Sequence, residues 1–571
     1  MKNYYHNSAK ALMFLLSLFY FYPANAYDFS EKNENGVTIF YNILSEDDKT
    51  CEVTAMEDGR INSEINSFTD YTDDIIIPYT ANGYLVSRIG KNAFLRCKSL
   101  SSVEIPNSVT TIGGSAFRDC TGLSSVTIPN SVTTIDDSAF RGCASLSSVE
   151  IPNSVTYLGY FAFYECIGLT SVKISNSITR INNCTFFGCS SLSSVTIPNS
   201  IQNIGSQAFQ ECDGLIDVKI PNSVTTISDN AFCDCISLAS LSIPSSVTKI
   251  EDGAFLNCES LTTVTIPRTV TRIGNNPFSS CSNLTSIIVE EGNPNYNSAN
   301  NCNAIIESNT NKFISGCKNS VIPNYITVIG RYAFSYCTDL STLEIPNSVT
   351  TIESRAFQGC SGLTTIEIPN SVKSIGESAF LKCAGLTSVT IPNSVTKIEN
   401  YAFRECDNLS SITSYITDVF VTGSWAFYRS SNATLYVPRG LVNTYRSKED
   451  WNRFTKIKEL PDISLTIACS DQGKVLVNNY QSFTNNIGEA SVFDGTENTF
   501  TFVPEDGYRL DRVLINGLNV TKSVKNNQLA TQIMPNTKMM VIFSPKKGDI
   551  NGDGIVNISD AVQIVNEILG K

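Results

Sequence analysis

The sequence predicts an α/β solenoid, in which short strands and short helical turns repeat along the chain. Three observations predict it: phenylalanine recurs every 23 residues over most of the chain, each copy carries short alternating apolar runs, and a cysteine follows nearly every one of these phenylalanines by three residues. A fixed period in this range is typical of stacked supersecondary units, none of which buries its own apolar edge without a neighbour.

The phenylalanines define the register of the repeats. We predict an array over residues 85–430, with an irregular long repeat at about 282–330 that interrupts the period. The last phenylalanine comes one residue late. The repeat phenylalanines are Phe94, Phe117, Phe140, Phe163, Phe186, Phe209, Phe232, Phe255 and Phe278, followed by Phe334, Phe357, Phe380, Phe403 and Phe427.

One copy, "LSSVTIPNSVTTIDDSAFRGCAS", begins at Leu123 and shows how a unit is built. Leu123, Val126 and Ile128 predict a short strand, because alternate side chains of a strand face the same side. Pro129 and Asn130 end that strand, since proline cannot donate to a ladder and asparagine favours turns.

The second half of the copy returns the chain to the core. Val132 and Ile135 predict a second extended stretch with inward contacts. Ser138 to Cys143 are then expected to form a short helical turn that buries Ala139, Phe140 and Cys143. Stacked copies of this unit are expected to lie ~4.8 Å apart, the spacing of paired strands.

The cysteines follow the same period, since 13 of the 19 occupy repeat positions. A disulfide framework is one interpretation for a secreted chain. We favour a buried stack of free thiols, because parallel Cβ atoms place stacked sulfurs beyond bonding distance, and a line of sulfurs does not suit a tetrahedral metal. Cys302 and Cys317 lie in the irregular repeat, and whether they pair stays open. The repeat cysteines are Cys97, Cys120, Cys143, Cys166, Cys189, Cys212, Cys235, Cys258, Cys281, Cys337, Cys360, Cys383 and Cys406.

The motif "LSSVTIPNSVTTIDDSAFRGC" closely resembles the BspA-type leucine-rich repeat of bacterial surface and secreted proteins. The irregular segment "VEEGNPNYNSANNCNAIIESNTNKFISGCKNSVIPN" is similar to the longer repeat seen in that family. The resemblance implies a leucine-rich-repeat solenoid, and adhesion or protein binding as in some members.

The N-terminal residues are expected to direct export. Residues 1–26 resemble a signal peptide, with Lys2 and Lys10, an apolar run "ALMFLLSLFYFY" too short for a comfortable membrane span, and an "ANA" cleavage pattern ending at Ala26. Residues 27–84 lack the period and contain strand-like runs, so we expect a β-rich cap over the first edge of the array.

Two modules are expected after the array. Residues 431–461, with Trp451 and Phe454, resemble the usual C-terminal cap of the family, and we expect Trp451 to be buried rather than a ligand platform. Residues 462–546 alternate apolar and polar residues between turns, which predicts a small all-β module. Its "FVPEDGYRLDRVLINGLNVT" resembles internalin B-repeat modules.

The last segment, residues 547–571, predicts a calcium site. Its pattern D-x-N-x-D-G-x-x-N-x-x-D supplies oxygen ligands at EF-hand spacing, and an apolar stripe follows that is typical of a short helix. The segment closely resembles one dockerin repeat, of which a typical dockerin has two, and this implies a cohesin-like partner. A calcium-stabilised plug on the β module is the alternative. The expected Ca²⁺ ligands are Asp549, Asn551, Asp553, the Ile555 carbonyl, Asn557 and Asp560.

Composition excludes several classes of function. The net charge of -13 argues against nucleic acid and anionic membrane as partners. The single histidine, His6, lies in the expected signal peptide. A mature chain without histidine has no Ser-His-Asp triad, Cys-His pair or imidazole metal site.

We expect the array to present the ligand face of a non-enzymatic secreted or cell-surface protein, which binds a protein, an extracellular-matrix component or a host surface. A calcium-dependent assembly component is the alternative, and a carboxylate-based glycoside hydrolase using a pair such as Glu290 and Glu291 is a remote one. A solvated face without a partner also stays open. The residues expected on the ligand face, which flank the inward strand residue, are Ser125, Thr127, Ser148, Glu150, Ser171, Lys173, Ser194, Thr196, Asp217 and Lys219.

Overall fold

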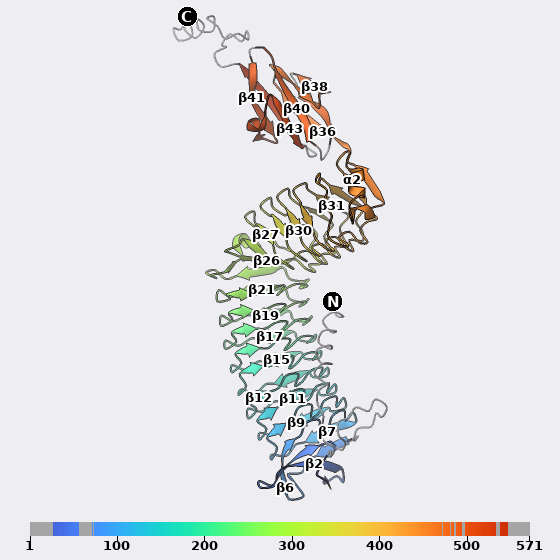
Figure 1. Ribbon diagram of the computed structural model, residues 1–571. Coiled ribbons are helices and arrows are strands. Elements are labelled where there is room, and N and C mark those ends of the chain that lie inside the picture. The colour runs from blue at the N-terminus through green and yellow to red at the C-terminus, as the bar shows by residue number, and fades with distance from the viewer. Residues whose placement is uncertain are drawn as a thin grey trace. The chain divides into compact units, whose positions relative to one another are not determined.

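The computed structural model describes residues 27–55, 71, 73–470, 472–479, 481–484, 487–493, 497–506, 508–532 and 537–545. The chain divides into two compact units, Met1–Pro323 with Gly330–Asp339 and Asn324–Ile329 with Leu340–Lys571 (Figure 1). The predicted signal peptide and the predicted calcium segment lie outside the described residues.

In the first unit, one short strand from each repeat lies on one face, the first strand face, where neighbouring strands pair in parallel within three successive sheets (Figure 1). Each step of the ladder pairs the same position of consecutive copies, so that Val149 pairs with Val172 and Val172 with Val195. The strands are β4 (Asp73–Ile76), β7 (Leu100–Glu104), β9 (Ser125–Thr127), β11 (Ser148–Glu150), β13 (Ser171–Lys173), β15 (Ser194–Thr196), β17 (Asp217–Lys219), β19 (Ser240–Ser242), β21 (Thr263–Ile266) and β23 (Ser286–Val289).

The second strand face takes two residues from each repeat, which pair in parallel within two successive sheets, and the isoleucine or leucine of each pair points inward. Ile135 pairs with Ile112 and with Leu158, and all three are buried. The strands are β8 (Thr111–Ile112), β10 (Thr134–Ile135), β12 (Tyr157–Leu158), β14 (Arg180–Ile181), β16 (Asn203–Ile204), β18 (Thr226–Ile227), β20 (Lys249–Ile250) and β22 (Arg272–Ile273).

The second unit repeats both ladders. One contains β27 (Val328–Ile329), β28 (Thr351–Ile352), β30 (Ser374–Ile375) and β32 (Lys397–Ile398), and the other contains β29 (Thr365–Glu367), β31 (Ser388–Ile391), β33 (Ser411–Ser414), β34 (Thr434–Val437) and β35 (Lys456–Glu459).

The N-terminal segment extends the second strand face of the first unit. Strands β1 (Phe29–Lys32), β2 (Thr38–Ser45) and β3 (Thr50–Thr54) pair antiparallel in chain order, and β5 (Thr80–Ala81) pairs with β6 (Tyr84–Ile89). Strand β3 pairs parallel with β6, which pairs with β8. This arrangement covers the first edge of the ladder, as an array requires.

The third side of each repeat differs from the prediction. We expected a helical turn from Ser138 to Cys143, but Ser138 and Gly142 have φ values of 59° and 71°. A right-handed helix cannot continue through such residues. Instead, the Phe140 N–H donates to the Ala162 carbonyl (2.8 Å), and the Gly142 N–H donates to the Tyr164 carbonyl (2.7 Å).

The same pair of left-handed residues, two before and two after the phenylalanine, recurs along the array. The fold is therefore a β-solenoid rather than an α/β solenoid. Among the described residues the one α-helix is α2 (Val442–Arg446). Pairs in other copies are Ser115 and Asp119, Phe161 and Glu165, Gln207 and Glu211, Asn230 and Asp234, and Trp425 and Arg429.

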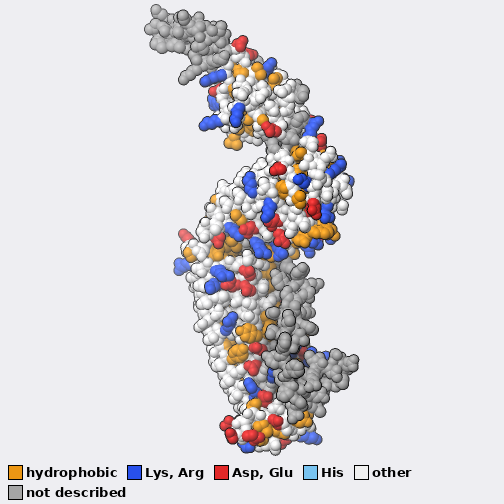
Figure 2. Space-filling view, in the orientation of Figure 1, with side chains coloured by type: hydrophobic (Ala, Val, Ile, Leu, Met, Phe, Trp, Pro, Cys, Tyr) orange, Lys and Arg blue, Asp and Glu red, His pale blue; other side chains and the backbone are white. Residues whose placement is uncertain are grey.

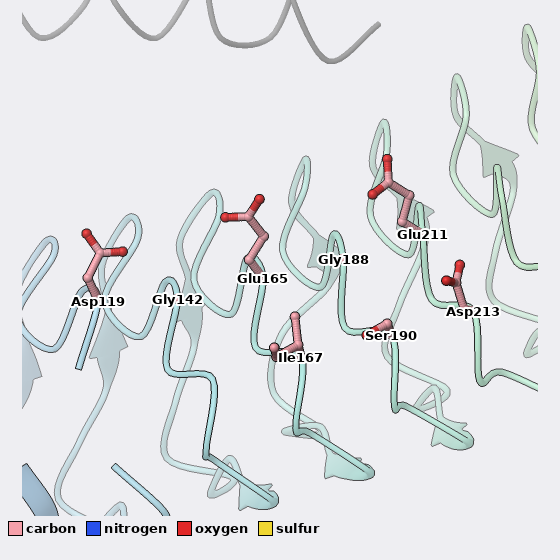
Figure 3. Close-up of a pocket in the computed structure, with 8 residues that line it drawn as sticks. All are labelled: Asp119, Gly142, Glu165, Ile167, Gly188, Ser190, Glu211 and Asp213. Atoms are coloured by element: carbon pink, nitrogen blue, oxygen red, sulfur yellow. The ribbon is translucent and has the colours of Figure 1, made fainter. Parts of the chain in front are cut away.

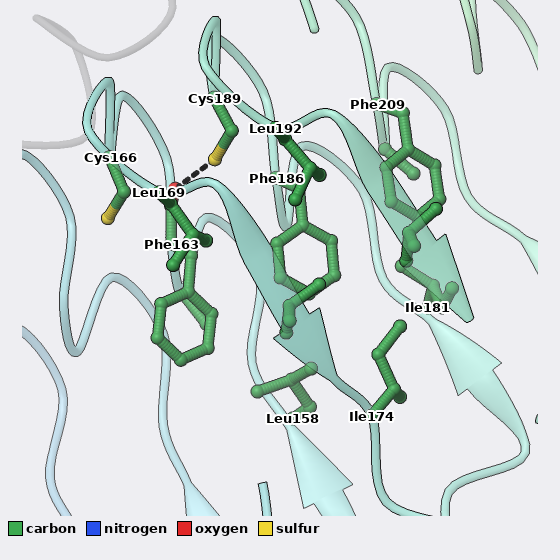
Figure 4. Packing of buried hydrophobic residues seen from close by; sticks show 14 of the residues in the cluster. Leu158, Phe163, Cys166, Leu169, Ile174, Ile181, Phe186, Cys189, Leu192 and Phe209 are labelled. Atoms are coloured by element: carbon green, nitrogen blue, oxygen red, sulfur yellow. Dashed lines mark hydrogen bonds between the residues drawn. The ribbon is translucent and has the colours of Figure 1, made fainter. Parts of the chain in front are cut away.

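The core of each repeat is its phenylalanine, which stacks on the next copy (Figure 4). From Phe94 to Phe278 successive ring centroids lie 5.0 to 5.7 Å apart, and the ring planes differ by 1° to 11°. In the second unit the stack runs from Phe357 to Phe427, with spacings of 5.1, 5.0 and 5.5 Å. Offset parallel rings at this distance attract one another beyond their burial.

The repeat cysteines are buried thiols, as predicted. Cys189 is an example, since its thiol donates to the Phe163 carbonyl of the preceding copy at 3.2 Å (Figure 4). Cys302 and Cys317, whose pairing was left open, are free thiols and buried. Burial raises the pKa of Cys166 to about 12 and the pKa of Cys189 well above its usual range. Nine other repeat thiols donate to the carbonyl of the repeat phenylalanine one copy earlier in the same way: Cys120, Cys143, Cys166, Cys212, Cys235, Cys258, Cys281, Cys383 and Cys406.

The irregular repeat adds antiparallel strands between the copies of Phe278 and Phe334. It forms β24 (Tyr296–Asn297), η1 (Ala299–Asn301), β25 (Ala304–Glu307) and β26 (Lys312–Gly316), with β24–β25 and β25–β26 antiparallel. The Ser280 N–H nevertheless donates to the Ser335 carbonyl (3.1 Å). This bond joins the same positions as in uninterrupted neighbours. Residues of the irregular repeat also pack against the copy of Phe334, since the Gly316 N–H donates to the Ala333 carbonyl (2.8 Å) and the Phe313 ring stacks on Phe334 at 4.9 Å.

The array ends in a cap built around Trp451. This side chain lies in η2 (Trp451–Arg453), is fully buried, donates from Nε1 to the Phe420 carbonyl (3.1 Å) and packs 4.9 Å from the Phe427 ring. The expectation that Trp451 is buried is confirmed.

The residues after the cap form two sheets around a separate apolar core. The strands are β36 (Asp462–Cys469), β37 (Gly473–Val477), β38 (Gln481–Thr484), β39 (Ile487–Phe493), β40 (Glu497–Pro504), β41 (Tyr508–Ile515), β42 (Leu518–Asn519), β43 (Gln528–Gln532) and β44 (Lys538–Pro545), and η3 covers Thr521–Ser523.

Removing one ring from the stack should loosen the array locally. Phe209→Ala is expected to lower the free energy of unfolding by about 3–5 kcal/mol, the usual cost of truncating a buried phenylalanine. Hydrogen exchange should show faster exchange in the copies next to Phe209 than in distant copies, because contacts in a solenoid are local. Exposed Ser194→Ala serves as the control, and equal exchange changes along the whole array would contradict the stacked core.

The buried thiols should react only after unfolding. A neutral thiol is a poor nucleophile, and burial that raises its pKa keeps it neutral. Titration of the native protein at pH 8 with a thiol reagent is expected to modify few of the repeat cysteines, and titration in denaturant should modify all of them. Because the folded-state pKa values lie above the unfolded ones, the stability that these thiols provide is present below about pH 9 and is lost as pH rises toward 12. Fewer than about six free groups in denaturant would contradict the thiol stack.

Candidate functional site

The first strand face presents a flat polar surface to solvent. In β11, β13 and β17 the central residues Val149, Val172 and Val218 are buried, whereas the two residues flanking each of them are exposed. The structure places all ten predicted ligand-face residues on this ladder and exposes each of them: Ser125, Thr127, Ser148, Glu150, Ser171, Lys173, Ser194, Thr196, Asp217 and Lys219.

Most of this face is uncharged, and its charges lie on neighbouring strands. Figure 2 shows mostly uncharged side chains and backbone over strands β15, β17 and β19. Lys173 on β13 contacts Glu150 on β11, with Nζ and Oε1 2.5 Å apart, and the Ser240 hydroxyl donates to Asp217 at 2.7 Å. The side chains of Lys173 and Glu150 are 69% and 67% exposed. Exposed pairs of this kind contribute little to stability.

A row of hydroxyls beside the face is held by the backbone. The Thr170 hydroxyl donates to the Ser147 carbonyl (2.9 Å), and the Ser193 hydroxyl donates to the Thr170 carbonyl (3.3 Å), each one copy back. These hydroxyls are already bonded. The row is interrupted at Ile216 and Ala239, which occupy the same position in two consecutive copies.

The turn side of the first unit carries a shallow acidic groove of about 420 Å³ (Figure 3). Within the groove every second copy has a glycine, Gly142 or Gly188, which leaves room beside the carboxylate of the preceding copy. A Cβ at Gly142 would lie 2.6 Å from Asp119 Oδ1, and a Cβ at Gly188 would lie 3.3 Å from Glu165 Cγ. The groove is lined by Asp119, Gly142, Glu165, Ile167, Gly188, Ser190, Glu211 and Asp213.

The groove residues were not predicted from the sequence, although a signal was present. The position two residues after the repeat phenylalanine reads Asp119, Gly142, Glu165, Gly188 and Glu211 in consecutive copies. Acidic residues and glycines alternate at this position. The alternation indicates a groove only when the position is known to lie in a left-handed turn at the surface.

Other predicted site residues lie elsewhere. Glu290 and Glu291 are exposed, do not line the groove, and Glu290 accepts a hydrogen bond from the Arg268 N–H (3.0 Å). The six predicted calcium ligands lie outside the described residues. Where the chain is described, no helix is both long and apolar enough to cross a membrane.

Comparison with protein families matches most of the repeat array. The model described as "BspA type Leucine rich repeat region" matches residues 87–216, 202–309 and 304–434. The chain belongs to the BspA-type leucine-rich repeat family. The resemblance of the repeat is thereby confirmed, whereas the dockerin-like C-terminus stays a prediction.

Solved structures of other leucine-rich repeat proteins are similar to this chain. A leucine-rich cell-surface protein from Faecalibacterium prausnitzii shares 28% identity, with coverage of 76% of this chain and 99% of that one and a TM-score of 0.46. A leucine-rich repeat protein from Bacteroides ovatus shares 26% identity, with coverage of 76% and 100% and a TM-score of 0.45. No curated protein matches the chain.

Proposed function

We propose that this BspA-type protein acts outside the cell as a non-enzymatic binding or adhesion protein, and that its first strand face contacts a protein, an extracellular-matrix component or a host surface. One observation carries the proposal: the buried residues of each copy stay constant while exposed residues on paired strands change, from Ser148 and Glu150 through Lys173 to Asp217 and Lys219. A broad polar surface with few apolar side chains suits a large, flat protein contact.

Export is part of the proposal. Residues 1–26 have the charge, apolar run and small-residue pattern of a signal peptide, and cleavage near Ala26 would release a mature chain beginning at Tyr27. The chain's membership of a family with members at bacterial surfaces supports this location.

Changing the charges of the face should reduce binding without unfolding the protein. The variant Lys173→Ala with Lys219→Ala is expected to lose at least about tenfold in affinity for whichever matrix protein or glycan the wild type binds on an array, because rim and surface charges steer association. Its free energy of unfolding should change by no more than about 0.5 kcal/mol, as for surface substitutions elsewhere.

The matched control places the same charge change on the other ladder. Arg180→Ala with Lys249→Ala removes two exposed cations from β14 and β20 of the second strand face. Binding by the control should equal that of the wild type. Equal binding by both pairs of variants, or no binding to any spot, would rule out the first strand face as a ligand site.

We further propose that residues 547–571 bind Ca²⁺ and attach the protein to an assembly through a cohesin-like partner. The donor set is all oxygen, which suits this hard cation: carboxylates of Asp549, Asp553 and Asp560, amides of Asn551 and Asn557, and the Ile555 carbonyl. Bound calcium would neutralise the repulsion of the three carboxylates and order the segment.

Limited proteolysis with and without calcium tests this site. Calcium is expected to protect the C-terminal segment in the wild type and not in Asp549→Ala, while the array is cut equally in all samples. A pull-down with a chain that lacks positions 547–571 then tests docking, and retention of all partners by the truncated protein would contradict it. Equal cleavage with and without calcium would show that the segment holds no metal.

A further inference from the structure

Five side chains near the C-terminal end of the array form a continuous stack of rings and guanidinium groups, the arginine–aromatic surface. The Arg404 guanidinium carbon lies 5.3 Å from the ring centroids of both Tyr401 and Tyr428. The Tyr428 and Trp425 rings meet edge to face at 4.9 Å. The Arg453 guanidinium carbon lies 4.8 Å from the Trp425 ring.

Each guanidinium is fixed by a carboxylate at its inner nitrogen. Arg404 Nε donates to Glu405 Oε1 (3.0 Å), and Arg453 Nε donates to Asp450 Oδ1 (2.5 Å). Asp450 is 2% exposed, and its other oxygen accepts the Ala426 N–H at 2.6 Å. The described residues give the terminal nitrogens of Arg404 and Arg453 no hydrogen-bond partner. Because a ring and a carboxylate already hold each guanidinium, little further rotamer freedom is lost when its terminal nitrogens bind a ligand.

The surrounding rings are exposed in spite of their size. Trp425 and Tyr428 are 42% and 37% exposed, and the side chains of Arg404 and Arg453 are 36% and 38% exposed. Trp425 and Tyr401 also occupy left-handed positions, with φ of 60° each. Other copies place serine, asparagine or glycine there, and two place the bulky Phe161 and Tyr332, so the left-handed conformation belongs to the repeat.

We propose that the arginine–aromatic surface is a second binding site, which docks an acidic peptide segment of a partner protein. Tryptophan, tyrosine and arginine are the residues that dominate binding energy at protein interfaces. A guanidinium end that is pre-oriented by ring stacking matches a carboxylate in a two-pronged hydrogen bond. At the edge of the surface, Arg429 adds a third exposed cation, paired with Asp407 at 3.1 Å.

The neighbouring charges and ring contacts argue against other ligand classes. Each arginine of the surface is paired with a carboxylate (Glu405, Asp407 or Asp450), so the surface lacks the excess of positive charge on which nucleic-acid binding depends. Recognition of a single carboxylate by a guanidinium rests instead on the local two-pronged geometry. Arginine side chains already stack against Tyr401, Tyr428 and Trp425, which leaves less ring face for a sugar. Four of the five side chains come from turns and Arg453 comes from η2, so none of them belongs to the first strand face.

Peptide binding to the full mature chain tests the proposal. The probes are short fluorescently labelled peptides that contain Asp, Glu and Tyr, and a matched set in which Asn and Gln replace Asp and Glu. Anisotropy is expected to detect binding of carboxylate peptides and at least about tenfold weaker binding of the amide set. Arg404→Lys and Arg453→Lys should each weaken the carboxylate peptides about tenfold, because lysine keeps the charge but loses the fork.

Two control variants test whether peptide binding depends on this surface. Arg141→Lys changes an arginine that also stacks on a tyrosine, 4.6 Å from the Tyr164 ring, but has no exposed tryptophan beside it, and it should bind like the wild type. The double variant Lys173→Ala with Lys219→Ala alters the first strand face and should also leave peptide binding unchanged. Loss of binding by the first strand face can then be told apart from loss of peptide binding by the arginine–aromatic surface. Thermal unfolding must show that Arg404→Lys and Arg453→Lys stay folded.

Three results would overturn the proposal. Equal affinity for carboxylate and amide peptides, or wild-type binding by both lysine variants, would exclude carboxylate recognition. Binding of a neutral glycan that is lost in Trp425→Ala and kept in Arg404→Lys would identify a sugar site instead. A concentration-dependent dimer in sedimentation that Arg404→Lys abolishes would show that a second copy of the chain occupies the surface.

Discussion

The backbone hydrogen bonds that pass from each copy to the next are the constraint on which the array depends. Three parallel columns of them fix the register of the copies, two through the strand ladders and one through the turns beside the phenylalanines. The turn column requires two left-handed residues in every copy, and these residues prevent a helix on that side. Once the register is fixed, the phenylalanines of uninterrupted copies stack on one another, and most of the repeat thiols face the carbonyl of the preceding copy.

This constraint separates structural from displayed residues. Inward positions contact the same position of the neighbouring copy, so a change there disturbs two interfaces at once. Outward positions on the strands contact solvent and tolerate Ser, Thr, Glu, Lys and Asp with little effect on stability. A solenoid of this kind presents many side chains on one face at a regular spacing, which suits contact with a large partner surface.

The two proposed binding surfaces differ in their chemistry. The first strand face is broad, polar and nearly free of aromatic side chains, so its affinity would come from many weak contacts. The arginine–aromatic surface is compact, and its guanidinium groups are held by rings and by the carboxylates of Glu405 and Asp450. The first strand face is therefore suited to contact with a large partner surface, and the arginine–aromatic surface is suited to binding a short peptide segment.

The period, the buried positions and the exposed pairs on the first strand face were predictable from the amino-acid order, because a regular repeat places equivalent residues in equivalent surroundings. The buried thiols and the buried Trp451 were predictable for the same reason. The structure was needed to show that Ser138 to Cys143 is a hydrogen-bonded turn and not helical, because the partners of its N–H groups lie in the next copy. Likewise the acidic groove and the stack of Arg404 between Tyr401 and Tyr428 join residues whose contact depends on how copies align, and no single copy carries that information.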